Sequence, residues 1–82
     1  MVIHKREMKP GDVYIGRPGP WGNPYIIGRD GTRAEVIAKY EQYLKRCHVL
    51  MAEIHTLKGK RLACWCSPLE CHGDILSFYA NR

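Results

Sequence analysis

Residues 61–66, Arg-Leu-Ala-Cys-Trp-Cys, have the composition of a short buried β-strand, and Ser67-Pro68 ends it. A second stretch of this kind, Asp12 to Gly16, lies on the other side of a long helical pattern. Because strands separated by helices are usually parallel and joined by right-handed crossovers, the carboxyl ends of both strands should meet at one edge of the sheet. The sequence therefore predicts an α/β fold with its binding site at this edge.

The helical pattern between the two strands starts at a capping box, in which Thr32 precedes Glu35 by three residues. Its apolar residues recur at spacings of three and four as far as about Leu57, at positions 37, 40, 44, 47, 51 and 54. We expect one helix here, or two if the chain breaks near Cys47-His48. Cys47 lies on the apolar stripe and is predicted to be a core residue.

Three shorter elements complete the predicted order. Val2 to His4 is expected to be an edge strand, Tyr25 to Ile27 a further short strand, and a final helix should begin near Leu69 and cover the sheet. The order is therefore strand, loop, one or two helices, strand, loop and helix. We predict a single small α/β domain over residues 1–82, with a short, mostly parallel sheet and helices packed on it.

The composition narrows the class of protein. The 82 residues are 45% hydrophobic and 26% charged, which argues against disorder, collagen-like repeats and a coiled-coil rod. Apolar runs are only a few residues long, so we expect a cytoplasmic protein without a signal peptide or a membrane partner. Thirteen Lys and Arg against eight Asp and Glu give a net charge of +5, which favours anionic partners such as nucleotides or nucleic acid.

A cluster of cysteines is the most informative chemical feature. Cys64, Cys66 and Cys71 lie close together, and His72 follows directly. Side chains alternate along a strand, so Cys64 and Cys66 should face the same way, and all four side chains suit one tetrahedral zinc ion. The spacing is not that of the common zinc fingers, and burial of Cys64 or Cys66 in the core is the alternative.

The same segment fits a second interpretation, in which the last helix begins near Leu69 or Glu70 and Cys71 and His72 lie in its first turn. Backbone amides and the helix dipole favour an anion there and lower the pKa of a thiol. Cys71 would then be a nucleophile with His72 as its acid or base partner, or both would hold a phosphate-like ligand. Asp74 is the third candidate catalytic residue, unless it is instead the N-cap of the helix.

The loop from Arg17 to Pro24 contains three prolines and two glycines and forms the second part of the predicted site. Arg17 offers a bidentate donor for phosphate or carboxylate, and Gly22 allows the backbone to approach a ligand. Trp21 offers a flat surface for a base, or else covers the small core. Asn23 can hydrogen-bond a polar ring edge or stabilise its own turn. We predict these four as ligand-binding residues.

Three motifs resemble those of a family of small bacterial and phage proteins described as a domain of unknown function. They are Val13-Tyr14-Ile15-Gly16-Arg17-Pro18, Trp21-Gly22-Asn23-Pro24, and Leu62-Ala63-Cys64-Trp65-Cys66 followed by Cys71-His72-Gly73-Asp74. The resemblance covers about Asp12 to Tyr79. It implies the α/β fold and the same site residues, and for a phage-encoded member it implies the host cytoplasm, but it assigns no reaction.

Together these observations predict a domain that binds a nucleotide- or nucleobase-like anion and, in a catalytic version, modifies it. The competing interpretation is a zinc-stabilised module that binds nucleic acid or protein and catalyses nothing. The sequence leaves open which of the two applies, whether the protein is an enzyme and whether it forms oligomers.

Overall fold

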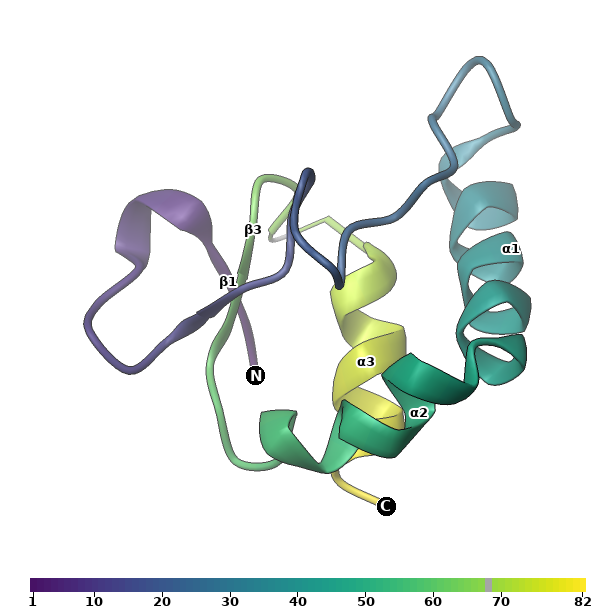
Figure 1. The fold of residues 1–82 in the computed structure, drawn as a ribbon. Coiled ribbons are helices and arrows are strands. Elements are labelled where there is room, and N and C mark those ends of the chain that lie inside the picture. The colour runs from purple at the N-terminus through teal and green to yellow at the C-terminus, as the bar shows by residue number, and fades with distance from the viewer. Residues whose placement is uncertain (68) are drawn as a thin grey trace.

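The order of elements matches the predicted α/β pattern. The computed structural model describes residues 1–67 and 69–82. Within these ranges the elements are β1 (Val2–His4), the 3-10 helix η1 (Lys5–Glu7), β2 (Val13–Tyr14), α1 (Arg33–Arg46), α2 (His48–Glu53), the 3-10 helix η2 (Ile54–Leu57), β3 (Leu62–Cys64) and α3 (His72–Ala80). The three strands form one parallel sheet in the order β1-β3-β2 (Figure 1). The prediction of a short parallel sheet with helices packed on it is confirmed.

The central position of β3 fixes the predicted edge of the sheet. Val2 of β1 and Val13 of β2 both pair with Leu62, one on each side of β3. Beyond β2, the Ile15 amide still donates to the Ala63 carbonyl at 2.9 Å. Because the strands are parallel and in register, the segments that follow β2 and β3 leave the sheet at the same edge.

The helices between β2 and β3 begin and break where the sequence predicts. Thr32 Oγ1 accepts a hydrogen bond from the Glu35 amide at 3.2 Å, and the Glu35 carboxylate accepts one from the Thr32 amide at 2.8 Å. The extended backbone of Cys47 separates α1 from α2. Gly59, with a φ of 74°, lies in the turn that leads back to β3. The capping box and the break at Cys47 are therefore confirmed.

Two of the predicted strands and the last helix have different boundaries. β2 and β3 are shorter than the expected 12–16 and 61–66, because the chain turns away from the sheet after each strand. The final helix starts at His72 and not near Leu69, since Cys71 is its N-cap.

The short strand expected over residues 25–27 is wrong. The Ile26 amide donates to the Asp30 carboxylate at 2.8 Å, and the Asp30 amide donates to the Ile26 carbonyl at 2.8 Å. Gly28, with a φ of 93°, lies inside this closed turn. These local bonds satisfy the backbone that a strand would otherwise have to pair with a neighbour.

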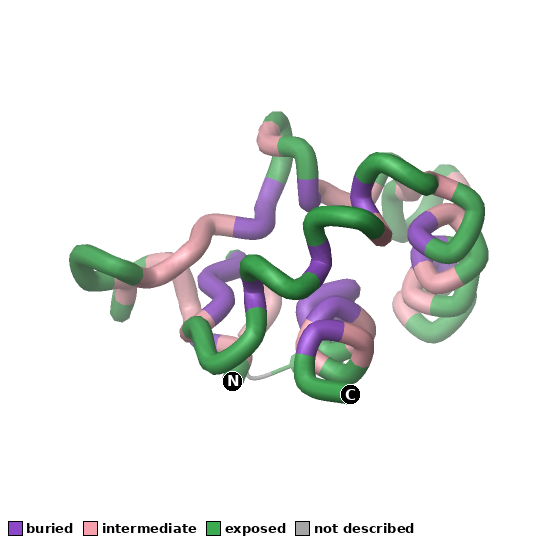
Figure 2. The backbone as a smooth tube through the Cα atoms, turned by 60° about the horizontal axis from the view of Figure 1, so that its bottom comes forward, coloured by how far each residue is buried: buried purple, intermediate pink, exposed green. Residues whose placement is uncertain are grey.

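The core lies where the sheet, α3 and α1 face one another, with α3 in the middle (Figure 1). Figure 2 shows the buried residues gathered between these elements and the exposed residues on the outer turns. Cys47 is half-buried and packs against this core, as expected of a stripe residue. The largest fully buried side chains come from the strands, their ends and the helices: Ile15, Tyr40, Leu44, Leu57, Leu62, Cys64 and Leu76. None of the described helices combines the length and apolar character that a membrane span requires.

Gly73, the second residue of α3, lets this helix approach the sheet closely. A Cβ at this position would lie 2.7 Å from Ile15 Cδ1 and 3.2 Å from Val2 Cγ1. Alanine normally favours a helix over glycine by up to about 1 kcal/mol, whereas overpacking costs about 1–3 kcal/mol. We therefore expect Gly73→Ala to destabilise the protein by about 1 kcal/mol in urea unfolding. An increase in the urea midpoint would show that α3 and the sheet can move apart enough to accommodate the added methyl group.

Candidate functional site

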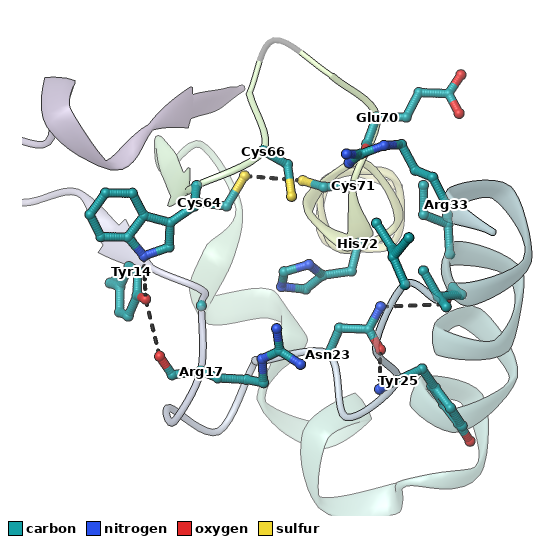
Figure 3. Close-up of a pocket in the computed structure, with 15 residues that line it drawn as sticks. Tyr14, Arg17, Asn23, Tyr25, Arg33, Cys64, Cys66, Glu70, Cys71 and His72 are labelled. Carbon is teal, nitrogen blue, oxygen red and sulfur yellow. Dashed lines mark hydrogen bonds between the residues drawn. The ribbon is translucent and has the colours of Figure 1, made fainter. Parts of the chain in front are cut away.

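A cavity of about 250 Å³ opens at the predicted edge of the sheet. Figure 3 shows side chains from distant parts of the chain around this space. The volume lies just below the range of about 300–1,000 Å³ typical of ligand pockets, so it suits a small ligand or one part of a larger one. Its walls come from the ends of two strands and from two helices. They include Tyr14 at the end of β2 and Arg17 after it, Cys64 at the end of β3 and Trp65 after it, Cys71 and His72 at the start of α3, and Arg33 and Val36 on α1.

The loop after β2 is fastened to α1. The buried Tyr40 hydroxyl donates to the Trp21 carbonyl at 2.8 Å. Asn23 Nδ2 donates to the Val36 carbonyl at 3.3 Å, and Asn23 Oδ1 accepts from the Tyr25 amide at 2.9 Å. These bonds hold the loop in a fixed position beside the cavity.

Arg17 brings positive charge to the cavity. Figure 3 draws its guanidinium below the His72 imidazole and beside the Asn23 side chain. No residue in the ranges 1–67 and 69–82 forms a hydrogen bond or ion pair with this guanidinium. Arg33 also lines the cavity, but its Nη1 already donates to the Glu70 carbonyl at 2.9 Å. Arg17 is therefore the side chain best placed to bind an anion.

His72 is a neutral, fixed imidazole in the wall of the cavity. Its Nε2 lies 2.7 Å from the Ile15 carbonyl, which can only accept, so Nε2 carries the proton and Nδ1 is an acceptor. Burial and, after it, the positive charge of Arg17 lower the pKa of His72 below its ordinary value. The Tyr40 ring packs edge-on against the imidazole, with 4.9 Å between the ring centroids. His72 thus offers a hydrogen-bond acceptor and carries no charge near neutral pH.

Cys64 and Cys71 form a close pair of thiols in the wall of the cavity. Their Sγ atoms are 3.1 Å apart (Figure 3), and both residues are buried. A hydrogen bond from the Cys71 thiol, together with the backbone amides of Cys66 and Ser67, lowers the pKa of Cys64 to about 6. Donation to Cys64 and burial raise the pKa of Cys71. The pair therefore holds its negative charge on Cys64 and its remaining proton on Cys71.

This arrangement differs from the predicted Cys71–His72 catalytic pair. The His72 Nε2 proton is directed to the Ile15 carbonyl and not to the Cys71 sulfur. Cys71 Sγ instead accepts from the Gly73 amide at 3.2 Å, as the N-cap of α3. Asp74, the third candidate catalytic residue, accepts from the Cys71 amide at 3.1 Å and completes a capping box. It is neither a wall of the cavity nor the N-cap itself.

The structure also locates the four predicted ligand-binding residues. Arg17 and Asn23 line the cavity, although both polar ends of the Asn23 side chain are used within the protein. Trp21 is only 8% exposed and belongs to the core, which was the alternative role for this residue. Gly22 is required for packing, since a Cβ there would lie 3.0 Å from Arg17 Cα.

The aromatic ring at the mouth of the cavity belongs to Trp65, a residue that the sequence patterns did not indicate as part of the site. Its side chain is 60% exposed, and its Nε1 donates to the Tyr14 hydroxyl at 3.0 Å. The Tyr14 hydroxyl in turn donates to the Arg17 carbonyl at 3.1 Å. Lys5 Nζ lies 5.9 Å from the Trp65 ring centroid. Strand alternation would place Trp65 on the face opposite its two cysteine neighbours. It lines the cavity together with them because β3 ends at Cys64 and the chain then leaves the sheet.

The predicted set of four zinc ligands is not assembled. Cys64 and Cys71 are adjacent, but His72 is bonded to the Ile15 carbonyl. In the part of the chain that the structure describes, no group of three or more His, Cys, Asp or Glu side chains is arranged to hold a metal ion.

Comparison with known proteins identifies the family. The family described as a domain of unknown function (DUF4326) matches residues 2–82. The chain belongs to this family. An uncharacterised 12.4 kDa protein from the nrdA-td intergenic region of Enterobacteria phage T4 is 37% identical over 76 residues, which cover 87% of this chain and 68% of the phage protein. No solved structure matches the chain significantly. Membership of DUF4326 agrees with the resemblance noted in the sequence motifs.

Proposed function

We propose that the cavity binds a nucleotide- or nucleobase-like anion and that Arg17 is its main contact to the negative charge. The supporting observation is the Arg17 guanidinium, which faces the cavity while no described residue neutralises it. Arg17 is an exposed residue, and most exposed arginines have no binding role. Here the loop that bears Arg17 is fixed by the hydrogen bonds of Tyr40 and Asn23, so the backbone of Arg17 is held beside the cavity.

The other walls of the cavity suit a planar, polar ring. Trp65 and Tyr14 provide aromatic surface at its mouth, and Lys5 adds a positive charge near these rings to those of Arg17 and Arg33. The Nδ1 lone pair of His72 can accept a hydrogen bond from a ring N–H or an exocyclic amine. A volume of about 250 Å³ accommodates part of a nucleotide, with the remainder at the solvent-exposed rim.

The proposal concerns binding and does not include catalysis by the Cys71–His72 pair. A general base has to reach the proton that it removes. The accessible nitrogen of His72 is Nδ1, and Cys71 is bonded to Cys64 and to the Gly73 amide. These contacts favour a site that recognises its ligand through Arg17 and His72.

The experiment is a thermal-shift screen followed by calorimetric titration of the compounds that bind. The screen uses nucleoside mono-, di- and triphosphates, free nucleobases and inorganic phosphate. At least one nucleotide should raise the melting temperature, and Arg17→Ala should weaken its binding about ten- to a hundredfold, as expected for a charged hydrogen bond. Arg46→Ala removes the same charge at the last residue of α1 and should bind as the wild type does.

Two results would contradict the proposal. In the first, Arg17→Ala and Arg46→Ala bind the compound equally well. In the second, no small anion shifts the melting temperature, while single- or double-stranded nucleic acid binds with steep salt dependence, which would indicate an extended surface.

A further inference from the structure

The close thiol pair in the wall of the cavity has no part in the proposed binding of an anion. Cys64 is the last residue of β3, and Cys71 is the N-cap of α3. The two sulfur atoms are 3.1 Å apart, whereas a disulfide bond is about 2.05 Å long. A side-chain movement of about 1 Å therefore separates the two free thiols from a covalent bond.

The surroundings of the two sulfur atoms are unequal. The backbone amides of Cys66 and Ser67 face Cys64, and the Cys71 thiol donates to it. Cys71 accepts from one amide, that of Gly73. Negative charge is therefore best stabilised on Cys64, which makes it the nucleophile of the pair.

Reagents can reach these sulfur atoms although both residues are buried from bulk solvent. Cys64 and Cys71 both line the cavity, which opens at the edge of the sheet. Hydrogen peroxide is smaller than any ligand considered for this cavity. Cys66 also lines the cavity but is only half-buried, and Cys47 packs against the core away from it.

We propose that Cys64 and Cys71 form a peroxide-reactive dithiol that closes reversibly to a disulfide at the cavity wall. The Cys64 thiolate attacks one oxygen of hydrogen peroxide, the O–O bond breaks, and Cys64 becomes a sulfenic acid as hydroxide leaves and takes up a proton to form water. The Cys71 sulfur then attacks the sulfenic sulfur. The S–S bond forms, the S–O bond breaks, and the oxygen leaves with the Cys71 proton as a second water.

Two thiols and one peroxide thus give one disulfide and two waters. A low-molecular-weight thiol such as glutathione reverses the reaction by attacking the disulfide, passing through a mixed disulfide and ending as its own oxidised dimer. The proposal does not depend on Arg17 or on the nature of any ligand, so it can fail or succeed independently of the proposed anion site.

The test uses the full chain at micromolar concentration. The protein is first reduced, the reductant is removed, and one equivalent of hydrogen peroxide is then added. After an acid quench, free thiols are alkylated with N-ethylmaleimide under denaturing conditions, and the intact mass is measured. The wild-type chain contains four cysteines and should lose two reactive thiols per monomer, with both recovered after treatment with glutathione. Cys66→Ser and Cys47→Ser should each still lose two.

Substitutions of Cys64 and of Cys71 should stop the peroxide reaction at different steps. Cys64→Ala should retain its remaining thiols. Cys71→Ser, whose hydroxyl can still act as N-cap, should stop at a sulfenic acid on Cys64 that a 1,3-diketone such as dimedone traps. Far-UV circular dichroism checks that each variant is folded. A disulfide that requires Cys66, one that joins two chains, or no thiol loss in the folded wild type would overturn the proposal.

Discussion

Replacement of Tyr40 by alanine is expected to lower the free energy of unfolding by about 3–5 kcal/mol, a large share of the stability of a domain of this size. Tyr40 is fully buried on α1 and belongs to the main core cluster. Its ring contacts His72, and its hydroxyl donates to the Trp21 carbonyl. Alanine removes the ring, leaves a cavity between α1 and α3, and frees the loop that carries Arg17.

Tyr40→Phe separates the hydroxyl from the ring. The phenylalanine variant retains the packing but leaves the Trp21 carbonyl without its donor, which should cost about 1–2 kcal/mol. Urea unfolding followed by circular dichroism measures both variants. Tyr43→Phe is the matched control, since no described residue hydrogen-bonds to the Tyr43 hydroxyl, and its midpoint should stay near that of the wild type. An unchanged midpoint for Tyr40→Phe would show that this hydrogen bond does not hold the loop.

Replacement of His72 by alanine is expected to cost about 2–3 kcal/mol at pH 7, the second-largest effect among these predictions. The Ile15 carbonyl loses its donor, and a buried ring is removed from beside Tyr40. The variant should also change how stability depends on pH, which distinguishes loss of the imidazole from a general packing defect.

The direction of the pH effect follows from the burial of His72. In the unfolded chain His72 takes up a proton as the pH falls below about 6.5. Burial and, less strongly, Arg17 keep the folded imidazole neutral to lower pH, although the hydrogen bond to the Ile15 carbonyl and the charge of Asp74 oppose them. The unfolded state then binds more protons, so the free energy of unfolding is highest above pH 6.5 and falls as the pH drops toward the lower folded pKa. The loss is at most about 1.4 kcal/mol per pH unit.

Unfolding free energies measured between pH 7.5 and pH 5 test this prediction. His72→Ala should show a smaller acid-dependent loss than the wild type, because only the part due to the lowered pKa of Cys64 remains. His48→Ala, which changes an exposed residue of α2, should retain the full loss. Equal slopes for the wild type and His72→Ala would mean that His72 titrates alike in the folded and unfolded chains.

Local sequence patterns predicted the framework because each depends on a few neighbouring residues. The Thr32–Glu35 capping box, the break at Cys47 and the parallel arrangement of the strands all agree with the structure. The incorrect strand prediction at residues 25–27 also has a local cause. Its apolar residues suggested β structure, but the carboxylate of Asp30 satisfies the backbone locally and closes a turn.

The edge of the sheet at which the cavity opens was determined by the sequence alone, since alternating strands and helices impose it. Tertiary structure alone decided which groups face the cavity and which partners they have. It placed Trp21 in the core and Trp65 at the rim, and it directed His72 to the Ile15 carbonyl, 57 residues away. It also set Cys71 against Cys64. The physical reason is that such contacts depend on how a helix end docks on a strand end, which no pattern over three or four residues encodes.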